Sequence, residues 1–139
     1  MQTIEKSQYL LLKEKLKACP MFIYPVKRNG GHFSLVGQAQ DNIILFAHLN
    51  DFKNNGILTT PMMVLVFFEE LLETKNLCLA RCDITDKSLS KEEASRVYSQ
   101  VAMFYATSEL YERFVVPFNR ESSAFNYNEY TKLMDISKY

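Results

Sequence analysis

The stretch MFIYPVKRNGGHFSLVGQAQDNIILFAHL, residues 21–49, decides the fold. It contains three β-prone runs, Met21–Val26, His32–Gln38 and Ile43–Leu49. Two short turns separate them, Asn29-Gly30-Gly31 and Asp41-Asn42. Turns this short join antiparallel neighbours, whereas parallel strands need a long crossover connection. The stretch therefore predicts consecutive antiparallel strands at the centre of the protein.

Outside this stretch, the chain adds two strands and an N-terminal helix. Met62–Phe68 and Leu77–Ile84 are β-prone, and the Asn-rich segment Asp51–Pro61 before them predicts a loop. Residues 4–18 carry spaced leucines among lysines and glutamates and stop at Cys19-Pro20. That pattern is typical of an amphipathic helix ended by proline.

Helices dominate the last third of the sequence. Ser90 and Glu93 have the spacing of a capping box, and the helix that they start should run to about Ala106. Ser108 and Asn126 are placed to cap two later helices. Strands that come first and helices that come last favour an α+β fold.

We therefore predict an α+β fold that covers residues 1–139 as a single domain. A largely antiparallel, twisted sheet of five or six strands is expected over residues 21–84. The N-terminal helix spans residues 4–18, and the C-terminal helices, in residues 90–137, pack on the sheet.

Composition argues against several classes of partner. The 16 basic and 16 acidic residues give a formal net charge of zero, so no broad field attracts nucleic acid or anionic lipid. The longest apolar run, Met62–Phe68, is far shorter than a bilayer span, so membrane insertion is not expected. Cys19, Cys78 and Cys82 fit no zinc template and are predicted to be reduced thiols.

No set of side chains in the sequence predicts catalysis, a cofactor site or a metal site. His32 and His48 lie in no motif that places a serine or cysteine beside them. Glu69 and Glu70 are adjacent and so do not share a face, which argues against a paired acid and base. One alternative stays open: a small-ligand-binding or enzymatic α+β domain with a pocket near His32 and His48.

Several segments resemble one known family, in the same order along the chain. They are Cys19–Pro25 (CPMFIYP), Phe33–Gln38 (FSLVGQ), Phe67–Leu71 (FFEEL), Gln100–Tyr105 (QVAMFY) and Phe118-Asn119 followed by Phe125. This order resembles the C-terminal domain of the mitochondrial ATP synthase assembly factors, the chaperones of the β subunit of the catalytic head. The resemblance is collinear from about residue 9 to residue 134.

The resemblance implies a non-enzymatic chaperone of the mitochondrial matrix that is a monomer when free and needs no cofactor. Such a protein binds the unassembled ATP synthase β subunit, prevents its aggregation and yields it to the α subunit. An unassembled subunit exposes apolar surface that favours aggregation, and covering that surface requires no catalytic group. Family members also carry a presequence and a helical segment ahead of this domain, whereas the first twenty residues here predict one helix only.

The predicted partner-contact residues are Tyr24, Phe46 and Tyr105. Period two along Ile43–Leu49 gives two faces that are both rich in apolar side chains. If helices cover one face, the other needs a different cover, so we expect a partly open sheet surface near Phe46 and Tyr24. The loop from Asp51 to Pro61 would form its rim. In the competing interpretation the N-terminal helix closes that face, and Tyr24 and Phe46 belong to the core.

Overall fold

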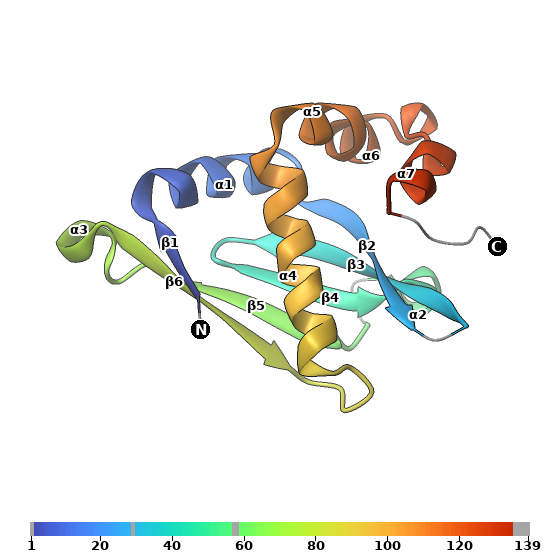
Figure 1. The fold of residues 1–139 in the computed structure, drawn as a ribbon, viewed down its shortest axis with the longest axis horizontal. Coiled ribbons are helices and arrows are strands. Elements are labelled where there is room, and N and C mark those ends of the chain that lie inside the picture. The colour runs from blue at the N-terminus through green and yellow to red at the C-terminus, as the bar shows by residue number, and fades with distance from the viewer. Residues whose placement is uncertain (1, 29, 57–58, 135–139) are drawn as a thin grey trace.

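The computed structural model describes residues 2–28, 30–56 and 59–134 (Figure 1). Over these residues the chain forms a six-stranded antiparallel sheet with the strand order β1-β6-β5-β4-β3-β2. The strands are β1 Gln2–Glu5, β2 Met21–Arg28, β3 Gly31–Gln40, β4 Ile43–His48, β5 Met63–Phe68 and β6 Leu77–Ile84. The predicted α+β fold with an antiparallel sheet is confirmed.

Helices lie at the N-terminal end, between strands and over the last third of the chain. They are α1 Lys6–Ala18, α2 Leu49–Asn55, α3 Leu72–Lys75, α4 Lys91–Ala106, α5 Ser108–Leu110, η2 Tyr111–Val115, α6 Val116–Arg120, η3 Ser122–Ala124 and α7 Tyr127–Met134. The capping box is confirmed, since the Ser90 hydroxyl accepts from the Glu93 N–H and the Glu93 carboxylate accepts from the Ser90 N–H. Asn126 caps α7 by accepting from the Glu129 N–H.

Three boundaries differ from the sequence-based expectation. Residues 4 and 5 belong to β1, because Ile4 pairs with Cys78 of β6 across a long sequence separation that no local pattern reveals. The expected loop from Asp51 to Pro61 begins inside helix α2, where the His48 imidazole accepts from the Asn50 N–H. The second C-terminal helix is preceded by Thr107 rather than capped by Ser108. Residues 57–58 of the expected loop and residues 135–137 of the expected helical region lie outside the described residues.

The main core lies between one face of the sheet and helices α1 and α4. Tyr9 of α1 packs on Phe67 of β5, with 5.4 Å between ring centroids. Phe22 of β2 packs on Phe104 of α4 at 5.0 Å. In Figure 1, α4 crosses in front of the sheet, and α5, α6 and α7 continue toward β2. This core accounts for the aromatic residues between Val97 and Asn119: Phe104, Tyr105 and Phe114 are buried in it, and Tyr98, Tyr111 and Phe118 pack against it.

The C-terminal helices also close the sheet edge formed by β2. The Asn119 side chain accepts from the Met21 N–H at 2.9 Å and donates to the Met21 carbonyl at 2.6 Å. The Tyr130 hydroxyl donates to the carbonyl of Ile23, and the Gln100 amide donates to that of Pro25. A free edge strand can pair with another chain through its unpaired backbone groups. Here side chains of the C-terminal helices form hydrogen bonds with those groups of β2.

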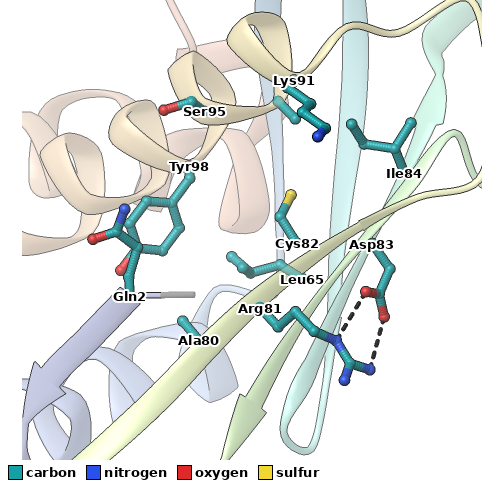
Figure 2. Close-up of a pocket in the computed structure, with 11 residues that line it drawn as sticks. Gln2, Leu65, Ala80, Arg81, Cys82, Asp83, Ile84, Lys91, Ser95 and Tyr98 are labelled. Atoms are coloured by element: carbon teal, nitrogen blue, oxygen red, sulfur yellow. Dashed lines mark hydrogen bonds and ion pairs between the residues drawn. The ribbon is translucent and has the colours of Figure 1, made fainter.

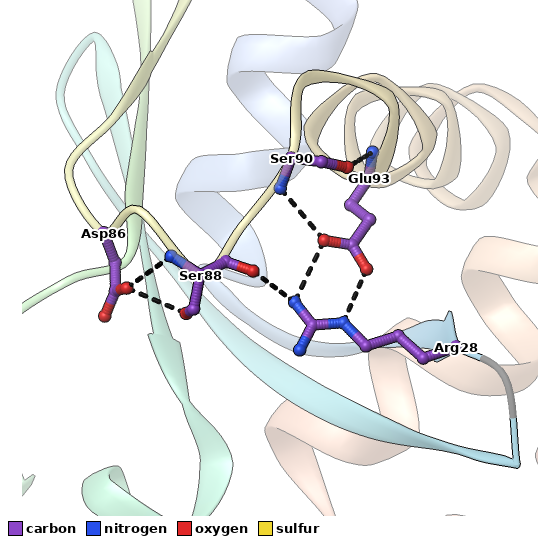
Figure 3. Close-up of polar contacts among 5 residues, drawn as sticks. All are labelled: Arg28, Asp86, Ser88, Ser90 and Glu93. Carbon is purple, nitrogen blue, oxygen red and sulfur yellow. Dashed lines mark hydrogen bonds and ion pairs between the residues drawn. The ribbon is translucent and has the colours of Figure 1, made fainter.

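An ion pair attaches the start of α4 to the β2–β3 hairpin (Figure 3). The Arg28 guanidinium donates to both carboxylate oxygens of Glu93, at 2.7 and 3.0 Å, and to the Ser88 carbonyl. Because Arg28 donates to it, the pKa of the Glu93 carboxyl falls from 4.5 to about 2. The pair therefore contributes stability above about pH 4.5, which is lost as the pH falls toward 2.

Replacing Glu93 by glutamine tests this ion pair. We expect Glu93→Gln to lower the free energy of unfolding by about 2 kcal/mol near neutral pH. The substitution removes the carboxylate charge from an ion pair that water partly screens, and it also weakens the cap of α4. The difference from the wild type should shrink as the pH falls below about 4.5 toward 2, as measured by urea unfolding at several pH values. Glu92→Gln, at an exposed position one residue earlier, is the matched control. A pH-independent loss would contradict the assignment.

Candidate partner-binding surface

The three predicted contact residues are buried. Tyr24 and Tyr105 are each 1% exposed, and Phe46 is 0% exposed. Tyr24 packs on Phe46 across Gly37, where a Cβ atom would approach the Tyr24 ring to 2.7 Å. The Tyr105 hydroxyl donates to the Cys19 carbonyl at 2.6 Å. This placement favours the core interpretation for all three, and their role in partner contact stays a prediction.

Strand register explains why Phe46 lies in the core. Phe46 pairs with Gly37 of β3, and Gly37 pairs with Phe22 of β2, so all three positions share one face of the sheet. Helix α4 covers Phe22 on that face. The surface that we expected near Phe46 is therefore on the face that the helices cover.

The opposite face of the sheet carries apolar side chains that stay partly exposed. Along β5, fully buried and half-buried residues alternate from Met63 to Phe68. Register places the half-buried side chains of three strands together, and we call this set the open face: Ile43, Leu45, Val64, Val66, Phe68 and Leu79. When one face of an antiparallel sheet is in water, its strands usually alternate apolar side chains toward the core with polar side chains toward water. Apolar residues at the water-facing positions therefore suggest that a partner covers this face.

Polar and charged groups border the open face. The Arg81 guanidinium lies over the Phe68 ring, 4.9 Å from its centroid, and pairs with Asp83 at 2.9 Å. Toward β3 the same face continues with Gln38 and Gln40. An apolar centre with a polar rim is the usual anatomy of an exchangeable protein–protein interface.

Two pockets lie on the helix-covered side, between α4 and the β1 edge of the sheet. The first is about 430 Å³, and Figure 2 shows Cys82 and Leu65 pointing toward α4 while Arg81 and Asp83 point away. The second is about 390 Å³ and lies between α1 and α4, where Leu11 is 61% exposed. Tyr98 lines both pockets, so they follow one another along α4.

The cysteine that lines the first pocket is not an activated nucleophile. Burial raises the pKa of Cys82 to about 11, which keeps this pocket-lining thiol protonated and weakly nucleophilic. Burial also raises the pKa of the Cys78 thiol to about 11. Within the described residues, no three His, Cys, Asp or Glu side chains gather as a metal site would require.

The alternative pocket around the two histidines is not supported by strand register. His48 pairs with Leu35, while His32 lies three positions earlier on β3 and so points to the other face. His48 stacks on Phe33 at 5.3 Å and caps α2, which is a structural role.

The open face, which the sequence analysis missed, had a visible signal in the sequence. Val64 and Val66 alternate with core residues at positions where a water-facing strand would carry polar groups. Which of the two apolar faces the helices cover was not readable from either strand alone. Among the described residues, every helix is too short or too polar to span a lipid bilayer.

The family model and the relatives that match this chain all point to one protein family. The sequence model of one family, described as ATP11 protein, matches residues 1–131. The mouse protein named ATP synthase mitochondrial F1 complex assembly factor 1 is 29% identical over 126 residues, covering 89% of this chain and 39% of the relative. Its zebrafish counterpart is 26% identical over 89% of this chain and 41% of the relative. Protein atp11, mitochondrial, from Schizosaccharomyces pombe is 26% identical over 76% of this chain and 39% of the relative. The chain thus spans about two fifths of the length of these relatives.

Proposed function

Since this chain belongs to the ATP11 protein family, we propose that it is an assembly chaperone for the catalytic head of mitochondrial ATP synthase. It acts in the mitochondrial matrix, binds the unassembled β subunit and needs no catalytic group. It keeps that subunit soluble until the α subunit takes its place. The names of the relatives, which specify F1 complex assembly, support the assembly role.

The observation that carries this proposal is the open face. It offers half-buried apolar side chains from β4, β5 and β6 inside a polar border. A β subunit without its α neighbour exposes apolar surface of its own, and two such surfaces shield one another from water. The chaperone must later release the β subunit and remain soluble when free. Half-buried apolar side chains suit this role better than fully exposed ones, because they leave less apolar surface in water.

Refolding of the β subunit tests the proposal. When denatured β subunit is diluted into buffer, light scattering should rise as it aggregates, and an equimolar amount of this chain should suppress that rise. Suppression should be stoichiometric, because a binding chaperone without an energy source does not turn over. Scattering that is unchanged at a tenfold excess of this chain would contradict the proposed function. An unrelated protein of similar size serves as the control for crowding.

A further inference from the structure

The two edges of the sheet differ in what covers their backbone. At the β2 edge, Asn119, Tyr130 and Gln100 bond the outward backbone groups. Pro25 in the same strand has no N–H to expose. The β1 edge, at the other end of the strand order next to β6, has no comparable cover in the described part of the chain.

Hydrogen-bond alternation shows which groups of β1 face outward. The Lys6 N–H donates to the Asn76 carbonyl at 2.9 Å, which continues the β1–β6 ladder. Because bonded pairs alternate in an antiparallel ladder, Ile4 directs its backbone groups toward β6, while Thr3 and Glu5 direct their N–H groups away. Both residues are exposed.

Apolar surface flanks this edge on both sides. On the helix side, Ile4 lines the pocket that also contains Leu11 and Leu12. On the other side, Thr3 pairs with Leu79, the last member of the open face. A strand added beside β1 would therefore place alternate side chains over the pocket and next to the open face.

We propose that β1 is a docking edge, at which an extended apolar segment of the unassembled β subunit adds a seventh strand to the sheet. This inference rests on the proposed function. The outward N–H groups of Thr3 and Glu5 and the Thr3 carbonyl match the backbone of such a segment, and the flanking surfaces match its apolar side chains. A second copy of this chain fits less well. If its β1 paired with this β1, the polar residues Gln2, Thr3 and Glu5 would lie against the flanking apolar surfaces.

The backbone of Glu5 permits a direct test. Its φ of −63° is already the value that proline requires, so Glu5→Pro removes an outward N–H with little strain. We expect Glu5→Pro to keep its melting temperature within a few degrees and to bind the β subunit at least tenfold more weakly. Glu5→Ala, which keeps the N–H, should bind like the wild type. Thr3→Pro removes the other outward N–H and should act like Glu5→Pro.

The possible results separate this inference from the proposed function. If the wild type binds the β subunit and both proline variants bind as tightly, the docking edge is refuted while the chaperone function stands. If the wild type does not bind at all, both fail. A wild-type dimer that Glu5→Pro dissociates, with β-subunit affinity unchanged, would make a second copy the occupant and would also overturn the inference. Affinity is measured by titration of labelled β subunit, and oligomeric state by light scattering after gel filtration.

Discussion

Phe46→Asp is expected to lose its cooperative thermal unfolding transition altogether. The side chain is 0% exposed and packs on Tyr24, with 5.5 Å between ring centroids. Removing a buried phenylalanine costs about 3–5 kcal/mol. Burying an unpaired carboxylate in its place adds several kcal/mol more. Together these approach or exceed the 5–15 kcal/mol that typically stabilises a domain. Circular dichroism during heating would detect the loss.

Leu45 is the matched control for Phe46. It is the preceding residue of the same strand but points to the open face and is only half-buried. Leu45→Asp should therefore retain a cooperative transition, although at a lower temperature. If Phe46→Asp melts cooperatively and loses β-subunit binding, Phe46 is a contact residue as the sequence analysis expected, and the placement of the binding surface on the other face is wrong.

Val66→Glu is expected to weaken binding of the β subunit about thirtyfold while leaving the fold intact. Val66 is half-buried near the centre of the open face and pairs with Arg81 of β6. A glutamate there lies opposite a cation, which offsets part of its cost in the free protein. In the complex the same carboxylate would be covered by apolar partner surface, at a cost of about 2 kcal/mol, or about thirtyfold in affinity.

Gln40→Glu provides the control for charge alone. Gln40 lies on the same face of the sheet but at its exposed end, in β3. This variant adds the same charge to the face without placing it in the apolar centre, so its affinity should stay within about threefold of the wild type. Equal loss of affinity in both variants would indicate long-range charge repulsion rather than contact at the open face.

Local chemistry explains which elements could be predicted from sequence. The turns at Gly30 and Asp41 adopt positive φ, and they fixed the β2–β3–β4 arrangement as short antiparallel connections. The bounds of β6 matched the prediction because Leu77–Ile84 is β-prone and bounded by turn residues. The capping box at Ser90 set the start of α4 through contacts only three residues apart.

The elements that sequence could not predict depend on distant contacts. β1 forms because Gln2–Glu5 pairs with Leu77–Ala80, more than seventy residues later, and it shows no alternation of its own. The same limit applies to the two faces of β4. Ile44 and Phe46 are as apolar as Ile43 and Leu45, so only the position of α4 decides which pair is buried.

Co-expression of this chain with the β subunit of ATP synthase from the same organism, followed by gel filtration, tests the central claim most directly. We expect the β subunit to elute in a soluble complex with the wild-type chain and with Gln40→Glu. With Val66→Glu most of it should instead be found in the insoluble fraction. If the wild-type chain elutes alone and the β subunit is as insoluble as without it, the chain is not a chaperone of that subunit.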